Sequence, residues 1–176
     1  FNGCSANNGL GNAIYIASNS QTLNNNYEYL YEFTGLTFSQ DQTTGYAVYL
    51  DNNYQSILIQ SSTFSFNQVT GDCGCINLIN VQKAKIYDCT FSINYVHNQK
   101  DETFSIEIDS CKFNQCSGST CLFDVKSGIS DQISLTGNTY TGCSKGNADS
   151  ILIGITRASN AALLTMQYNT FSCTTT

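Results

Sequence analysis

Apolar and polar residues alternate in short runs along the whole chain, and most of these runs end on an aromatic residue. The aromatic anchors stand at steps of 37, 26, 27, 22, 27 and 31 residues, at Phe1, Phe38, Phe64, Phe91, Phe113, Tyr140 and Phe171. The positions five and seven residues before each of the last six anchors are all apolar. Alternation with period two is typical of strands. A unit of about 20–50 residues that recurs along a chain indicates a solenoid, a propeller or an array.

Two kinds of strand are predicted in each unit. The first ends at the anchor, over 56–64, 84–91, 104–113, 132–140 and 163–171. There, β-branched and aromatic residues alternate with polar ones, as in a strand with one buried face. The second strand follows a turn rich in Gly, Asn, Ser and Asp, over Ala13–Ile16, Ala47–Leu50, Cys75–Leu78, Cys121–Val125 and Ser150–Ile155. The unit from Phe91 to Phe113 is the shortest, so its second strand is expected to be missing or absorbed into a turn.

A unit of two or three short strands cannot bury its apolar face alone, whereas stacked units bury a continuous core. The unit is too short for the four strands of a propeller blade. We therefore predict an all-β fold, a parallel β-helix of about six to seven coils, as one domain over residues 1–176 that can be a segment of a longer chain. Its core is expected to hold an aromatic ladder of Phe38, Phe64, Phe91, Phe113, Tyr140 and Phe171.

Two short motifs resemble a known repeat. Phe64-Ser65-Phe66-Asn67 and Phe91-Ser92-Ile93-Asn94 are similar to its FxxN half, and Gly11-Asn12-Ala13-Ile14 and Gly45-Tyr46-Ala47-Val48 to its GGAI half. The motifs resemble the repeat of polymorphic outer-membrane proteins, a family that, like similar surface proteins of protists, uses parallel β-helices. The resemblance implies a right-handed β-helix that serves as a passenger or ectodomain stalk at the cell surface. It brings no catalytic residue with it.

The charge pattern excludes several partners. The net charge is −6, and no lysine or arginine precedes Lys83. Nucleic-acid binding needs clustered basic residues that neutralise phosphates, and anionic membranes attract the same residues. The chain also lacks a run of about 20 apolar residues that could span a bilayer. We therefore expect no nucleic-acid partner and no membrane insertion.

The nine cysteines favour an oxidising, extracellular compartment. Cys89 and Cys111 stand two residues before consecutive anchors, and Cys116 and Cys143 stand three residues after. Stacked coils are about 4.8 Å apart, which is within the Cα separation of a disulfide. Each pair is thus expected to form either a disulfide or two stacked free thiols. The Cys73-Gly74-Cys75 spacing is too short for the usual zinc pair, so we expect no metal and no cofactor.

Parallel β-helices include polysaccharide lyases and hydrolases, which place their carboxylates on one face of neighbouring coils. Counted from the anchors, the carboxylates of this chain form no such column: Asp72, Asp88, Asp109, Asp124 and Asp149. Hydrolases need an acid and a base that face one groove. His97, the one histidine, lies in a polar segment that is typical of a solvated turn. We therefore expect no enzyme and no catalytic residue.

Tyrosines are concentrated in the N-terminal third and form a candidate contact surface for sugars or proteins: Tyr15, Tyr27, Tyr29, Tyr31, Tyr46, Tyr49 and Tyr54. An alternative is that Tyr29 and Tyr31 point to opposite sides of a strand. The expected function is an extracellular structural or adhesive β-helix, a candidate subunit of a head-to-tail fibre. Its partners would be copies of itself or adjoining segments of a longer chain. The alternative is a glycan-binding or degenerate polysaccharide-processing domain.

Overall fold

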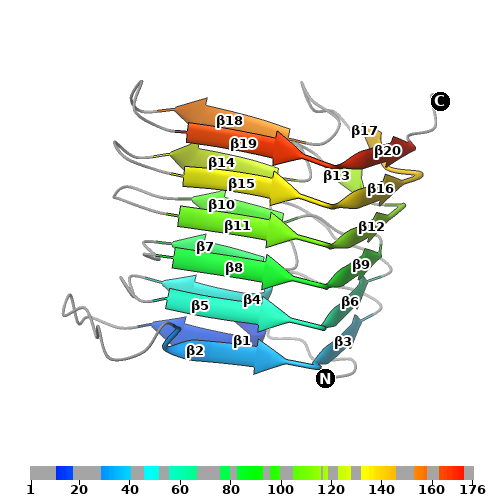
Figure 1. The fold of residues 1–176 in the computed structure, drawn as a ribbon. Coiled ribbons are helices and arrows are strands. Elements are labelled where there is room, and N and C mark those ends of the chain that lie inside the picture. Colours follow the sequence, from blue (N-terminus) through cyan, green and yellow to red (C-terminus); the bar gives the residue numbers. More distant parts are fainter. Residues whose placement is uncertain are drawn as a thin grey trace.

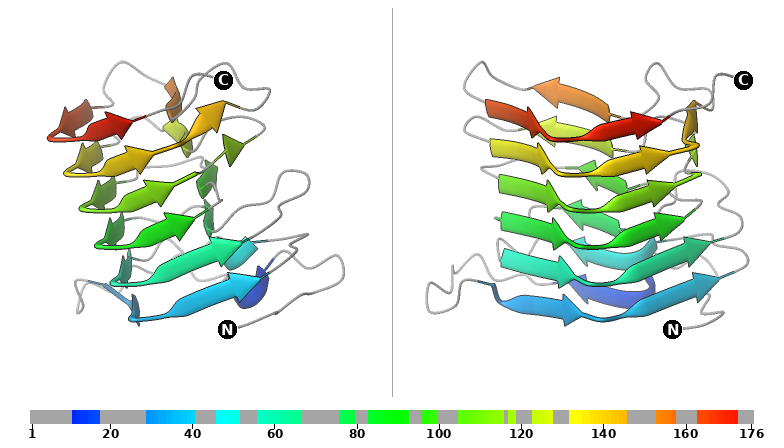
Figure 2. Two further views of the ribbon diagram at one scale, coloured as in Figure 1. Left: turned by 90° about the vertical axis from the view of Figure 1, so that its right-hand side faces the viewer. Right: turned by 45° about the vertical axis from the view of Figure 1, so that its right-hand side comes forward.

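The computed structural model is a right-handed parallel β-helix (Figures 1 and 2). It describes residues 11–17, 29–40, 46–51, 56–66, 76–79, 83–92, 96–99, 105–115, 117–118, 123–127, 132–145, 153–157 and 163–172. In each coil the chain runs along one sheet, turns into a second and returns along a third before it enters the next coil. Each of the three sheets contains six parallel strands.

The strands of equivalent position in successive coils form the sheets. Sheet 1 contains β2 (Tyr31–Thr34), β5 (Ser56–Gln60), β8 (Lys83–Tyr87), β11 (Ser105–Asp109), β15 (Gln132–Thr136) and β19 (Leu163–Gln167). Sheet 2 contains β3 (Thr37–Gln40), β6 (Thr63–Phe66), β9 (Thr90–Ser92), β12 (Lys112–Asn114), β16 (Thr139–Thr141) and β20 (Thr170–Ser172). Sheet 3 contains β1 (Gly11–Ala17), β4 (Tyr46–Asp51), β7 (Ile76–Ile79), β10 (Val96–Gln99), β14 (Phe123–Ser127) and β18 (Ile153–Arg157). A further short pair joins β13 (Ser117–Gly118) to β17 (Ser144–Lys145).

The aromatic anchors form one column inside sheet 2. Each anchor pairs with the next across neighbouring strands, in the order Phe38, Phe64, Phe91, Phe113, Tyr140 and Phe171. Consecutive ring centroids are 4.8–4.9 Å apart and the rings are within 10° of parallel. This spacing equals the distance between strands and exceeds the closest carbon contact of about 3.5–4.0 Å, so the rings are offset as aromatic pairs prefer.

Alternating residues of sheets 1 and 3 complete the core. Ile57 and Ile59 of β5 are about 1% exposed, whereas their neighbours on the strand are half-buried and face outward. On the opposite side, Val48 and Leu50 of β4 are fully buried. Equivalent strands of successive coils pair in register. Each inward position therefore forms a column that runs through the coils. The positions five and seven residues before the anchors are two of these columns, as the sequence pattern predicts.

A sharp corner separates sheet 1 from sheet 2, so each predicted first strand is two strands. The corner begins three residues before the anchor, and its first residue has a positive φ in every coil: Gly35, Ser61, Asp88, Ser110, Gly137 and Tyr168. This left-handed conformation is unfavourable for most side chains. The backbone N–H of Ser61 donates to the Tyr87 oxygen of the next coil (3.1 Å), and every other corner up to Gly137 makes the equivalent bond. Strand pairing therefore continues through the turn, which compensates for the unfavourable dihedral.

The shortest coil differs from our expectation. Its return strand is present as β10, which pairs with β7 and β14. His97 lies in this strand, opposite Asn77 and Asp124, and not in a solvated turn. A polar segment without apolar alternation is typical of a turn, yet here parallel pairing on both sides satisfies its backbone.

Candidate functional site

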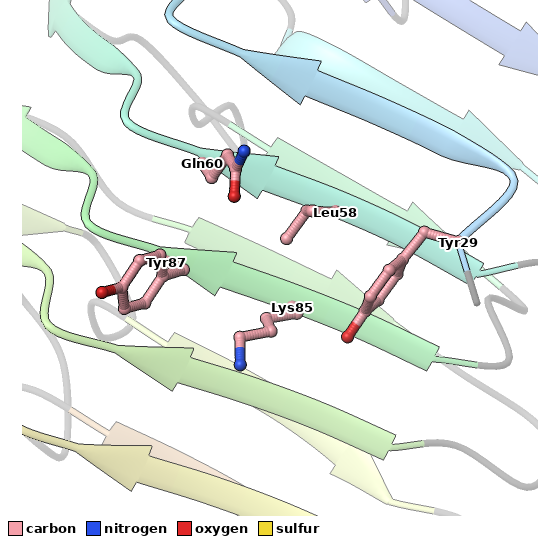
Figure 3. A pocket seen from close by; sticks show the side chains of 5 residues that line it. All are labelled: Tyr29, Leu58, Gln60, Lys85 and Tyr87. Carbon is pink, nitrogen blue, oxygen red and sulfur yellow. The ribbon is translucent and has the colours of Figure 1, made fainter.

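A hollow of about 300 Å³ lies on the outer face of sheet 1 (Figure 3). Five side chains line it: Tyr29, Leu58, Gln60, Lys85 and Tyr87. The two tyrosines stand at opposite sides, and Leu58 and Lys85 lie between them. Leu58 and Gln60 alternate with the buried residues of β5, as Lys85 and Tyr87 do on β8. The pleat therefore directs these four side chains outward, on neighbouring strands of a rigid sheet.

Cations border both aromatic rings of the hollow. The Lys83 ammonium lies 4.5 Å from the centroid of the Tyr29 ring, and Lys85 Nζ lies 5.6 Å from that of Tyr87. A cation within about 6 Å of an aromatic face is attracted by the negative charge of that face. Each contact favours the observed position of its ring by about 0.5–1 kcal/mol.

Lys85 also forms an ion pair across the strands. Its Nζ lies 2.8 Å from Glu107 Oε1, in the next coil, where the two residues are direct register partners. The hydrogen bond to Glu107 raises the pKa of Lys85, and the partial burial of the ammonium opposes this effect. The side chains are about one-third exposed, so the pair contributes little to stability, about 0–1 kcal/mol. The ion pair matters for the charge of the hollow, because the Glu107 carboxylate neutralises the Lys85 ammonium.

The amide of Gln60 is the second polar group of the hollow. Its Nε2 donates to Thr34 Oγ1 at 3.2 Å, across the strands β5 and β2. One of its two amide hydrogens is thus used within the sheet. The hollow therefore combines two aromatic rings, one aliphatic floor residue, one amide and one ammonium, whose ion-pair partner Glu107 lies on the next strand.

The predicted cysteine columns are thiols where the structure describes them. Cys89 and Cys111 are buried free thiols, so the disulfide alternative is wrong for Cys89–Cys111. Cys143 is buried as well. Each sulfur points to backbone oxygens: the Cys89 thiol donates to the Tyr87 oxygen at 3.3 Å, and that of Cys111 to Asp109 at 3.3 Å. Cys116, the predicted partner of Cys143, lies outside the described residues.

The surroundings of the Cys111 thiol keep it protonated. The contact with Cys89, followed by burial, raises the pKa of the Cys111 thiol. Both residues are about 1% exposed or less, which keeps reagents away from their sulfurs. The geometry is that of packed core thiols rather than of a nucleophile.

The predicted tyrosine surface is divided between two faces. Tyr15 is exposed and stacks on the buried Tyr49, with centroids 5.5 Å apart, on sheet 3. Tyr29 borders the hollow on sheet 1 (Figure 3). Sheets 1 and 3 lie on opposite sides of the β-helix (Figure 1). Tyr31 is half-buried and packs against the core, so the alternative of one inward and one outward ring describes Tyr29 and Tyr31. The side chain of Tyr46 and the residues Tyr27 and Tyr54 lie outside the described part of the chain.

The described part of the chain offers few groups for metal binding or for catalysis by carboxylates. No three His, Cys, Asp or Glu side chains there are grouped as for a metal ion. Asp88 begins a corner and accepts from Ser61 Oγ at 3.3 Å, and Asp109, at the end of β11, accepts from Ser110 Oγ. Among the described residues, no helix is long and apolar enough to cross a bilayer.

No model of a known protein family matches the chain, and neither curated proteins nor solved structures match it. The resemblance of the FxxN and GGAI motifs therefore stays a prediction. The assignment of the fold rests on the geometry of the strands alone.

The hollow has a signal in the sequence, at positions that the apolar pattern leaves aside. The outward positions lie four and six residues before the anchor, where Leu58, Gln60, Lys85 and Tyr87 stand in consecutive units. Glu107 occupies the same position as Lys85 in the following unit. Aligned as columns, these positions place Lys85 beside Glu107. The contribution of Tyr29 has no such signal, because it precedes its strand.

Proposed function

We propose that this protein is an extracellular structural or adhesive β-helix that lengthens by stacking coils end to end. The single observation that carries the proposal is the state of the terminal coil (β18–β20). There Leu164, Met166 and Phe171 are 40–47% exposed. The residues at the same positions one coil earlier, Ile133, Leu135 and Tyr140, are at most 2% exposed. Core positions of this kind are buried once another coil covers them.

The edge strands of the terminal coil favour such an addition. Edge strands of natural sheets are commonly protected by charged residues, prolines or bulges, because their free backbone groups template further pairing. The sequences of β19, Leu163–Gln167, and of β20, Thr170–Ser172, contain neither a charged residue nor a proline. A further coil could therefore continue both sheets and stack an aromatic ring on Phe171 without burying a charge.

The partner that we propose is the first coil (β1–β3) of another copy. That coil forms the opposite edge of all three sheets, in the same spatial order (Figure 2). Its apolar residues Ile14, Ile16, Tyr31 and Phe33 pack against the core and are only partly buried. A head-to-tail contact between unlike surfaces that adds copies along the helix axis does not close into a ring, so it produces a filament. An adjoining segment of a longer chain is the other occupant that fits the same surface.

The location of the protein has weaker support than its architecture. The free thiols of Cys89 and Cys111 add no support for an oxidising compartment. The surface location then depends on the motif resemblance and on a low charged fraction of 11%. Secretion of the native chain, followed with an antibody on intact cells, tests it.

Assembly is tested with residues 1–176 by negative-stain microscopy and sedimentation at concentrations from about 1 to 200 µM. We expect rods that lengthen with concentration, built from units about 25–30 Å tall for six coils. Met166→Lys places a charge in the end surface and should leave single short rods. Gln132→Lys, on an exposed position of the coil before, is the matched control and should assemble as the wild type does. Uniform short rods of the wild-type protein at every concentration would refute the proposal.

A further inference from the structure

The hollow on sheet 1 has the composition of a carbohydrate site. A hexose has one face of C–H groups and a rim of hydroxyls, so it needs an aromatic platform together with donors and acceptors at its edge. Tyr29 and Tyr87 supply two rings at opposite sides of the hollow. The negative face of an aromatic ring attracts the positive C–H groups of a sugar. Leu58 provides an apolar floor between the rings.

The polar groups are placed to bind hydroxyls. The Lys85 ammonium has three donor hydrogens and uses its short bond with Glu107, 2.8 Å, for one of them. The Glu107 carboxylate has two oxygens and about four acceptor positions. Gln60 adds an amide that both donates and accepts. Neighbouring hydroxyls of a sugar can thus meet a donor and an acceptor at once.

The charges of the hollow select for an uncharged ligand. Lys85 and Glu107 compensate each other at 2.8 Å, and Lys83 faces the Tyr29 ring at 4.5 Å. The Asp109 carboxylate also acts on Lys85, so the two lysines are balanced by two carboxylates. The chain as a whole carries −6. An acidic polysaccharide would meet a compensated cation within an anionic protein, which costs affinity. A neutral saccharide avoids this repulsion.

We infer that the hollow bordered by Tyr29 and Tyr87 binds a neutral oligosaccharide, one ring of which lies over Leu58. The lining residues come from three successive coils: Tyr29 precedes β2, Leu58 lies on β5, and Lys85 and Tyr87 lie on β8. Glu107 of β11 pairs with Lys85 from a fourth coil. The rigid sheet fixes their spacing before a ligand arrives, so little ordering is required on binding. The hollow is at the small end of ligand pockets, which are about 300–1,000 Å³, so a single site should bind in roughly the millimolar range.

The probes are neutral tetrasaccharides and hexasaccharides of β-1,4-glucose, β-1,3-glucose, mannose, xylose and N-acetylglucosamine, with oligogalacturonates as the acidic comparison. Titrations followed by NMR use the Met166→Lys protein, whose change lies in the terminal coil, away from the hollow. We expect at least one neutral series to bind. Tyr87→Ala and Tyr29→Ala should weaken it about tenfold, while Tyr87→Phe should stay within about threefold of the parent, because the ring remains.

Two further variants make the test specific. Tyr15→Ala removes an exposed tyrosine from sheet 3 and should leave the affinity unchanged. Glu107→Gln leaves Lys85 with an uncompensated charge, so it should weaken the neutral ligand and improve the oligogalacturonate. Tyr87 is 39% exposed, and circular dichroism should show its variants folded. The inference is overturned if no neutral probe binds at about 20 mM, if Tyr87→Ala binds within about threefold of the parent, or if the parent prefers the acidic probe.

Discussion

Asn138 occupies a corner of the β-helix where its side chain replaces backbone pairing. The residue is fully buried. Its Oδ1 accepts from the Cys111 N–H at 2.9 Å, and its Nδ2 donates to the Ile108 oxygen at 2.8 Å. One asparagine therefore serves a donor and an acceptor of the preceding coil. The Asn169 side chain repeats the arrangement one coil later, with Asn138 N–H and the Leu135 oxygen.

We predict that Asn138→Leu destabilises the protein by about 2–5 kcal/mol. The substitution conserves the filled space, and Leu36 already occupies the equivalent corner position of the first coil. It leaves the Cys111 N–H and the Ile108 oxygen buried without these partners, at about 1–3 kcal/mol for each group. At about 2–4 °C per kcal/mol for a chain of this size, the melting temperature should fall by roughly 10 °C.

Asn138→Asp should make the stability of this corner depend on pH, because only one of the two hydrogen bonds survives when the side chain is ionised. The carboxylate can still accept from Cys111 N–H, but it faces the Ile108 oxygen without a donor. Burial and this oxygen should raise the folded-state pKa of the aspartate above its unfolded value of about 3.9. A raised pKa means that the variant keeps its stability below about pH 4 and loses it as the pH rises through the folded-state value. Asn138→Leu should show no corresponding difference from the wild type.

Hydrogen exchange read by mass spectrometry locates the effect, since coils of a solenoid can open separately. Faster exchange is expected in peptides over 105–115 and 132–145. Asn169→Leu is the control, because the same bonds lie in the more exposed terminal coil and should contribute less. The reasoning is refuted if Asn138→Leu melts within about 1 °C of the wild type with unchanged exchange at the corner.

Three further experiments test the core: two substitutions and one chemical labelling. Phe91→Ala removes a ring from the middle of the aromatic column and should cost about 3–5 kcal/mol, measured by denaturant unfolding; a loss below about 1 kcal/mol would argue against a packed column. The buried Tyr140 hydroxyl has no hydrogen-bond partner among the described residues, and burial raises its pKa, so Tyr140→Phe should stabilise the protein by about 1 kcal/mol in thermal melts. Without reductant, Cys89 and Cys111 should resist iodoacetamide in the folded protein and react after unfolding; labelling that requires reductant would indicate a disulfide.

Most of the core could be predicted from the sequence, because its geometry repeats. A residue five positions before an anchor meets its equivalent in the next coil, so every inward column must be apolar throughout. The sequence therefore predicts that Ile59, Ile86 and Ile108 pack on one another. The same reasoning places Cys89 next to Cys111, but it leaves open whether the sulfurs are bonded. That choice depends on where each thiol points, and both donate to backbone oxygens.

The corners were not predictable from residue types. Three residues before the anchor stand glycine, serine, aspartate and tyrosine, and all of them adopt a positive φ. Tyr168 and Ser110 carry no local preference for this conformation. Pairing with the neighbouring coil imposes it, so the sequence predicts one long strand where the chain makes two.

The class of the fold, the period of its coils and the residues that fill its interior all follow from the sequence alone. They do so because apolar side chains must be buried, a requirement that each unit meets in the same way. The repeat also places Lys85 beside Glu107. That Tyr29, which precedes its strand, joins them on the outside depends on the folded arrangement. Outward side chains are not constrained by burial, and their contacts depend on strand register between coils and on corner geometry. The repeat therefore predicts the scaffold, whereas the candidate site forms only when the coils are stacked.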